Sequence, residues 1–127
     1  MSGIVIIGAG QAGSSLALKL RALGYDGNVT LIGDEPVLPY QRPPLSKKYL
    51  LGDMALDRLY LRPRDLYTEQ LISLRLNTQV TTINSAENSI SIRDETLSYD
   101  HLALTTGSTP RLLPAAIGGR LDGVFAV

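Results

Sequence analysis

Three glycines follow a short apolar run near the start of the chain, in a spacing that suits a diphosphate ligand. The run Ile4–Ile7 ends in Gly8-Ala-Gly10-Gln-Ala-Gly13, and an amphipathic segment, residues 14–23, follows without a break. At a strand–turn–helix corner, the first glycine permits the tight turn, the second lets backbone approach a pyrophosphate, and the third lets the helix pack closely. The free N–H groups of that helix then face the phosphates. The pattern predicts a dinucleotide site; the same corner without a ligand is the alternative.

Two acidic residues follow the second apolar run, Val29–Ile32. Asp34 stands about twenty residues beyond Gly13, the spacing typical of a carboxylate that accepts hydrogen bonds from a ribose. Glu35 is its neighbour. The sequence does not decide which of the two carboxylates faces a ribose, and either can be a solvated loop charge.

A proline-rich stretch from Pro39 to Lys48 carries three further residues of interest. Arg42 can hold a phosphate through two parallel hydrogen bonds. Ser46 can cap a short helix. A cation at Lys47, in the first turn of that helix, opposes the helix dipole, so a ligand contact explains it better than helix stability does. A surface loop with solvated charges is the alternative.

The segment 99–108 reads as a strand that ends in small residues and Gly107, where backbone can lie against a planar ligand. The only histidine, His101, opens this strand. The chain has neither a second histidine nor a cysteine to pair with it, so we expect a structural or surface role.

These residues need an α/β framework: a parallel sheet that starts with a βαβ unit and carries a small antiparallel insertion. A turn at 84–88 joins two of the later strands. Beyond the first βαβ unit, the expected helices are 46–51 and 63–71, and the expected strands are 74–76, 80–83, 89–93, 102–105 and 124–127.

Composition narrows the function classes. The chain of 127 residues fits one domain, and its 12 basic and 12 acidic residues cancel, so we expect no nucleic-acid partner and no attraction to an anionic membrane. No cysteine is present, which excludes disulfides, thiolate metal sites and cysteine nucleophiles within these residues and fits a cytoplasmic protein. The first apolar run is too short for a signal segment or a membrane span. We expect no metal site.

Taken together, the motifs resemble one family. Gly-Ala-Gly-Gln-Ala-Gly, the run 29–36, Pro-Tyr-Gln-Arg-Pro-Pro-Leu-Ser-Lys and the Thr-Thr-Gly that ends at Gly107 are similar to the N-terminus of FAD-dependent ferredoxin reductases. This group includes putidaredoxin, rhodocoxin and biphenyl-dioxygenase reductases, and apoptosis-inducing factor is also similar. The Arg-Pro-Pro-Leu-Ser-Lys run is far more specific than the glycine pattern. The resemblance covers the whole of this chain but only the beginning of the family's chain.

The resemblance implies noncovalent FAD in a Rossmann-type domain, reduced by NAD(P)H, with electrons passed on to a [2Fe–2S] ferredoxin or a rubredoxin. Glycines and Ala12 would hold the pyrophosphate, the acidic pair the ribose, Arg42 and Lys47 the flavin cofactor, and Val80 the adenine through its backbone. One departure from the family's Ala-Thr-Gly is Thr105 in place of alanine. Carried over by motif, the cofactor-binding residues are Gly8, Gly10, Ala12, Gly13, Asp34, Glu35, Arg42, Lys47, Val80, Thr106 and Gly107.

The same resemblance excludes the disulfide reductases and leaves three hypotheses for this chain. Disulfide reductases carry a redox Cys-x4-Cys pair soon after the ribose acid, where this chain has Arg-Pro-Pro-Leu-Ser-Lys. We expect residues 1–127 to be the N-terminal part of an FAD-binding domain, without the NAD(P)H and C-terminal domains and without turnover alone. The rest of the reductase chain would then be a partner. The alternatives are an autonomous nucleotide-binding or scaffold module, and a relative with a different electron acceptor.

Overall fold

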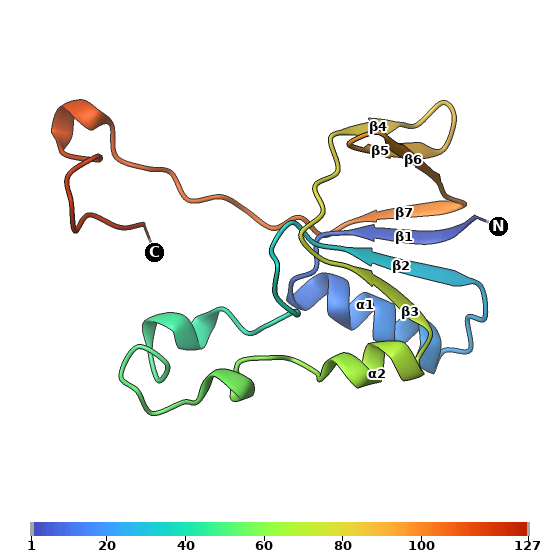
Figure 1. Ribbon diagram of the computed structural model, residues 1–127, viewed down its shortest axis with the longest axis horizontal. Coiled ribbons are helices and arrows are strands. Elements are labelled where there is room, and N and C mark those ends of the chain that lie inside the picture. Colours follow the sequence, from blue (N-terminus) through green and yellow to red (C-terminus); the bar gives the residue numbers. More distant parts are fainter. Residues whose placement is uncertain (1, 127) are drawn as a thin grey trace.

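Four parallel strands form the centre of the protein in a computed structural model that describes residues 2–126 (Figure 1). Their order is β3-β2-β1-β7, so the first strand lies inside the sheet. Ile6 stands beside Leu31 of β2 and Ala103 of β7. The strands are β1 (Gly3–Ile7), β2 (Asn28–Ile32), β3 (Ile72–Arg75) and β7 (His101–Leu104).

Two helices cover one face of this sheet, α1 (Gln11–Ala22) and α2 (Arg64–Glu69) (Figure 1). The core on this side is apolar except where the hydroxyls of Ser14 and Tyr67 share a hydrogen bond of 2.7 Å. That bond joins α1 to α2 and satisfies two buried polar groups at once. The buried side chains of this core are Ile6, Ala17, Val29, Leu31, Tyr67 and Ile72.

A small antiparallel sheet covers the other face, with the order β4-β5-β6 (Figure 1). Because successive residues of a strand face opposite sides, β1 sends Ile6 toward the helices and Val5 toward this second sheet. Both faces of the parallel sheet are therefore buried, which explains its continuous apolar runs. The strands are β4 (Thr82–Asn84), β5 (Ser89–Ile92) and β6 (Glu95–Ser98), and their core holds Val5, Ile32, Ile90, Ile92 and Tyr99.

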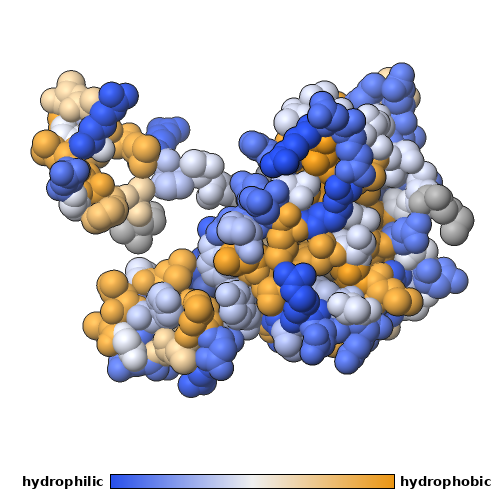
Figure 2. Space-filling view, viewed as in Figure 1, coloured by the Kyte–Doolittle hydropathy of each residue, from blue (hydrophilic) through white to orange (hydrophobic). Residues whose placement is uncertain are grey.

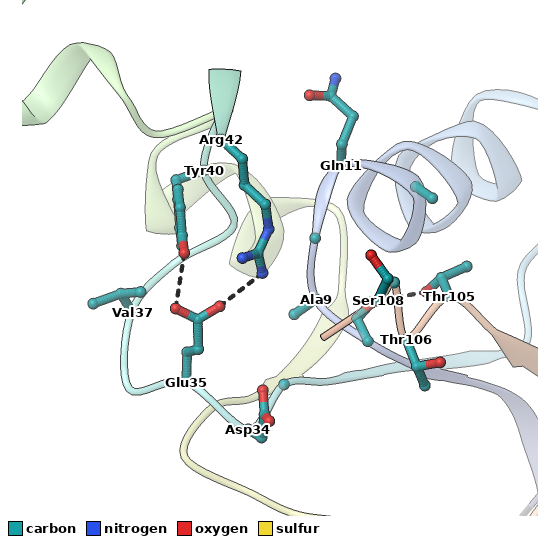
Figure 3. A pocket seen from close by; sticks show the side chains of 15 residues that line it. Ala9, Gln11, Asp34, Glu35, Val37, Tyr40, Arg42, Thr105, Thr106 and Ser108 are labelled. Carbon is teal, nitrogen blue, oxygen red and sulfur yellow. Dashed lines mark hydrogen bonds and ion pairs between the residues drawn. The ribbon is translucent and has the colours of Figure 1, made fainter. Parts of the chain in front are cut away.

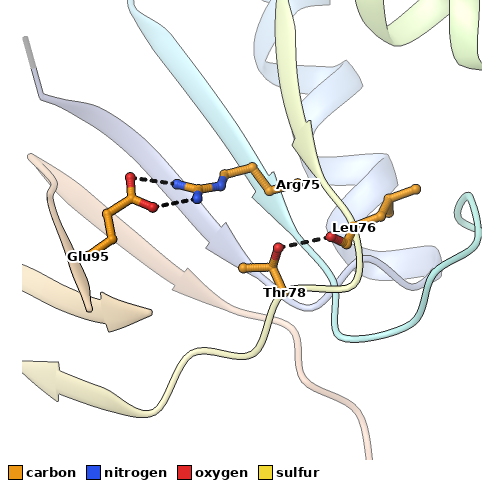
Figure 4. Close-up of polar contacts among 4 residues, drawn as sticks. All are labelled: Arg75, Leu76, Thr78 and Glu95. Carbon is orange, nitrogen blue, oxygen red and sulfur yellow. Dashed lines mark hydrogen bonds and ion pairs between the residues drawn. The ribbon is translucent and has the colours of Figure 1, made fainter. Parts of the chain in front are cut away.

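A bidentate ion pair ties the two sheets together at their edge (Figure 4). Arg75, the last residue of β3, donates to both carboxylate oxygens of Glu95 in β6, at 3.1 and 2.6 Å. Just beyond it, the Thr78 hydroxyl donates to the Leu76 carbonyl and shapes the connection toward β4. Hydrogen bonding to Arg75 holds the pKa of Glu95 below its ordinary value.

Two segments project from the sheets and expose apolar side chains (Figure 2). The first is 45–56, where the exposed fraction of Leu51 is 75%; the second is the tail 108–126, where that of Phe125 is 85%. Regular structure in and beside these segments is limited to short 3-10 turns, at Pro43–Ser46, Leu56–Arg58 and Ala115–Ile117.

The α/β framework, the βαβ start and the antiparallel insertion are confirmed. Several boundaries were wrong. The helix expected at 46–51 is a 3-10 turn over Pro43–Ser46 followed by turns, because Pro43 and Pro44 bring the first turn forward. Val80 and Thr81 precede β4, and β6 was not expected. Residues 124–126 form no strand, and Val127 lies outside the described residues.

Candidate functional site

The carboxyl ends of β1, β2 and β7 meet at a cavity of about 380 Å³ (Figure 3). In parallel sheets, ligands bind beyond the carboxyl ends of the strands, where neighbouring loops separate. The lining combines peptide backbone from the glycine turn with acidic and basic side chains from the loop after β2. The lining residues are Gly8, Ala9, Gly10, Gln11, Ala12, Gly33, Asp34, Glu35, Val37, Tyr40, Arg42, Thr105, Thr106, Gly107 and Ser108.

Each glycine of the turn has its own steric reason. Gly8 has φ of 110°, and a Cβ there would run into the Thr105 carbonyl. A Cβ on Gly13 would collide with the Gly8 carbonyl, so this glycine lets α1 sit against β1. A Cβ on Gly10 would meet nothing within 4 Å, because this residue borders the open cavity. The turn is thus closed toward the sheet and open toward the site.

The open side presents unpaired peptide donors. Within residues 2–126, the backbone N–H groups of Ala9, Gly10, Gln11 and Ala12 donate to no acceptor. Gly10 is the N-cap of α1, and the first turn of the helix contains no acidic side chain. The positive end of the helix dipole therefore faces the cavity without a carboxylate of the helix to neutralise it. This arrangement suits an anion.

The two neighbouring acids have different surroundings (Figure 3). Glu35 accepts a hydrogen bond from the Tyr40 hydroxyl and another from the Arg42 guanidinium, each at 2.9 Å. Asp34 is exposed at the cavity and accepts no hydrogen bond from the described part of the chain. Asp34 is therefore the carboxylate with free acceptor capacity, and Glu35 organises the loop.

Glu35, Tyr40 and Arg42 form one small polar cluster. The Arg42 guanidinium lies over the Tyr40 ring, 5.2 Å from its centre, which adds a cation–π contact to the ion pair. Burial, and then the hydrogen bond to Glu35, raise the pKa of Tyr40 above its ordinary value, so its hydroxyl stays a donor. Arg42 uses one N–H toward Glu35, and its other guanidinium N–H groups donate to no acceptor within residues 2–126.

The structure brings most of the predicted site residues together, but not all. Eight of them line the cavity: Gly8, Gly10, Ala12, Asp34, Glu35, Arg42, Thr106 and Gly107. Gly13 lies behind the turn, against the Gly8 carbonyl. Lys47 is exposed and Val80 packs into the core beneath the antiparallel sheet, and neither lines the cavity. His101 lies exposed at the start of β7, away from the lining.

Sequence reasoning missed the parts played by Tyr40 and by the hydroxyl of Thr105. Tyr40 stands within the Pro-Tyr-Gln-Arg motif, but nothing in that motif says that its hydroxyl reaches back to Glu35. The Thr105 hydroxyl turns inward and donates to the Gly8 carbonyl at 2.8 Å. The departure from alanine is accommodated by a hydrogen bond.

The described residues form neither a metal site nor a membrane-spanning helix. Within residues 2–126, no group of histidine and carboxylate side chains is arranged to hold a metal ion. Nor does any helix of that part of the chain have the length and apolar character needed to cross a membrane.

Comparison with known proteins agrees with this geometry. Residues 2–127 match the family model described as pyridine nucleotide-disulphide oxidoreductase. Putidaredoxin reductase CamA of Pseudomonas putida is 47% identical over 91% of this chain, and rhodocoxin reductase of Rhodococcus erythropolis is 47% identical over 95%. The crystal structure of a covalent putidaredoxin reductase–putidaredoxin complex superposes with a TM-score of 0.88 at 47% identity, covering 92% of this chain and 28% of that one. The chain spans 28% of the length of either relative. It belongs to the pyridine nucleotide-disulphide oxidoreductase family.

Proposed function

We propose that residues 1–127 bind the adenosine diphosphate half of FAD as the N-terminal part of an FAD-binding domain. The observation that carries this proposal is one cavity bordered by N–H groups of the glycine turn and a carboxylate that have no partner among residues 2–126, together with a guanidinium. Phosphates need donors and positive potential, whereas a ribose needs an acceptor for its hydroxyls. The cavity offers both.

The donor set fits FAD when the chemistry of each residue is matched to a part of the cofactor. The open side of Gly10 leaves room for a diphosphate against the backbone, next to the N–H groups of Gln11 and Ala12. The free carboxylate of Asp34 suits the ribose, and Arg42 suits a phosphate oxygen. Lys47 and Val80 stay predictions, for the flavin and the adenine.

For the whole protein we propose an NAD(P)H-dependent reductase of a ferredoxin or a rubredoxin. The names of the two relatives, putidaredoxin reductase and rhodocoxin reductase, support this class. Bound FAD would supply an acceptor that takes two electrons together and releases them one at a time. We further propose that the chain alone does not turn over, because its described residues hold one candidate nucleotide cavity. We also propose that the protein is cytoplasmic.

The exposed apolar segments support a larger domain. Leu50 and Leu51 on one projection, and Leu112 and Phe125 on the other, have exposed fractions of 72% or more. Apolar side chains gathered on two projections are typical of surfaces that another part of a protein covers. We propose that the remainder of the reductase chain is that cover.

Cofactor binding by the purified 127-residue chain tests the proposal. FAD and ADP should bind, whereas FMN, which lacks the adenosine and one phosphate, should bind far more weakly. Asp34→Ala should weaken FAD binding, and Asp53→Ala, at an exposed loop carboxylate outside the cavity, is the matched control. Fluorescence quenching and calorimetry give the dissociation constants. Absence of FAD binding, even with the rest of the reductase supplied in trans, would overturn the proposal.

A further inference from the structure

Thr105 is the first residue after β7, and its side chain lies against the glycine turn, beside Gly8 and Gly13. Its hydroxyl donates to the carbonyl oxygen of Gly8 at 2.8 Å and to that of Ile7 at 3.2 Å. Its backbone N–H also donates to Ile7, at 2.8 Å. The hydrogen bonds of the hydroxyl thus add to the backbone hydrogen bonds that pair β7 with β1. Figure 3 shows Thr105 at the edge of the cavity.

Both backbone polar groups of Gly8, its N–H and its carbonyl, are fixed by hydrogen bonds. The Gly8 N–H donates to the Ile32 carbonyl of β2 at 2.8 Å, and the Gly8 carbonyl accepts from Thr105. The same carbonyl lies against the Cα of Gly13, where a Cβ would collide with it. Gly8 itself, at φ of 110°, has the conformational freedom of glycine and depends on these contacts for a fixed orientation.

The orientation of this carbonyl decides where the next N–H group points. A trans peptide is planar, so the carbonyl of Gly8 and the N–H of Ala9 point in opposite directions. The described chain has no cis peptide bond. Ala9 lines the cavity, and its N–H has no acceptor within residues 2–126. A hydroxyl that fixes the Gly8 carbonyl therefore also fixes an unpaired donor of the site.

We propose that Thr105 is a positioning residue: its hydroxyl sets the Gly8–Ala9 peptide plane so that the Ala9 N–H is ready to meet a phosphate. This inference rests on the proposed function. It extends that function because Thr105 replaces the alanine of the family motif to which this chain is similar. The hydrogen bond from the Thr105 hydroxyl to the Gly8 carbonyl is therefore a property of this sequence. Its effect falls on the phosphates and not on the adenosine.

Two variants separate the hydroxyl from the shape of the side chain. Thr105→Val keeps the branched shape and removes the donor, whereas Thr105→Ser keeps the donor. Titration of the purified chain with ADP and with adenosine should show ADP binding about three- to tenfold weaker in Thr105→Val, the effect of one hydrogen bond. Adenosine binding should stay within about twofold, and Thr105→Ser should restore ADP binding. FAD should follow ADP.

A ligand-free measurement accompanies the titration. In amide NMR spectra, the Ala9 resonance should shift in Thr105→Val and return toward its original position in Thr105→Ser. An unshifted Ala9 resonance, unchanged ADP affinity or an equal loss of ADP and adenosine affinity would each overturn the inference. The proposed function would survive all three, because wild-type chain would still bind FAD. Failure of the wild-type chain to bind ADP or FAD would overturn the proposed function and this inference together.

Discussion

Glu35 and Arg42 form an ion pair of 2.9 Å at the cavity, whereas the neighbouring carboxylate of Asp34 accepts no hydrogen bond within the described part of the chain. Two adjacent acids thereby take separate tasks. Both partners of the pair are well exposed, with side-chain exposed fractions of 65% for Arg42 and 43% for Glu35. Such a pair adds little to stability, so its consequence is the orientation of the guanidinium.

Asp34 and Glu35 should respond differently to removal of their charge. We expect Asp34→Asn to weaken FAD binding about tenfold, because a charged acceptor of ribose hydroxyls is lost. Glu35→Gln should weaken it less, because an amide oxygen still accepts from Arg42 or Tyr40. Calorimetric titration with FAD gives both values. Equal losses in the two variants would contradict the separate tasks.

The glycines should separate folding from binding. Gly10→Ala adds a methyl group where the structure has open space, so we expect a stability change of about 1 kcal/mol or less, from the helix cap, together with a marked loss of FAD affinity. Gly8→Ala should instead destabilise the fold, because its Cβ would meet the Thr105 backbone at a positive φ. Urea unfolding and FAD titration distinguish the two. Tight FAD binding by Gly10→Ala would contradict the proposal that the diphosphate lies against the backbone at the open side of Gly10.

The hydrogen bond between Ser14 and Tyr67 should be a strong link between α1 and α2. Tyr67→Phe leaves the buried Ser14 hydroxyl without its partner, so we expect the free energy of unfolding to fall by about 1–2 kcal/mol. Adding Ser14→Ala should cost less than the sum of the single changes, because no orphaned hydroxyl remains. Tyr49→Phe, at a half-exposed tyrosine, is the control and should stay within about 0.5 kcal/mol. Strict additivity in the double variant would contradict a shared bond.

The ion pair of Arg75 and Glu95 should appear in the pH dependence of stability. The folded pKa of Glu95 is lowered below 4.5, chiefly by its hydrogen bond to Arg75, so its stabilisation is full above that value and is lost as pH falls through the folded pKa. The same hydrogen bond raises the pKa of Arg75, so the guanidinium stays charged throughout the acidic range and adds no pH dependence there. Between about pH 6 and pH 3, the urea midpoint of wild type should therefore fall more steeply than that of Glu95→Gln. Glu87→Gln, at an exposed acid with no ion pair among the described residues, should keep the wild-type slope.

Local sequence determined the start of the fold and the centre of the site. The apolar run, the spaced glycines and the acid after β2 act over neighbouring residues, since a tight turn and a close backbone approach depend on the missing side chains of those glycines. The βαβ unit and most of the predicted cavity lining therefore follow from the amino-acid sequence alone. Boundaries near Pro43 and in the antiparallel sheet did not, because pairing partners there decide where a strand begins.

Tertiary structure decided which atoms are left free for a ligand. The adjacent positions of Asp34 and Glu35 in the sequence do not indicate that Tyr40 and Arg42 donate to Glu35. They also do not indicate that Asp34 is left without these donors. Likewise, the Thr105 hydroxyl meets the Gly8 carbonyl only because β7 lies beside β1, although the two residues are far apart in the chain. Hydrogen-bond capacity is shared among neighbours in space, so the fold and not the sequence order assigns the remaining donors and acceptors of the site.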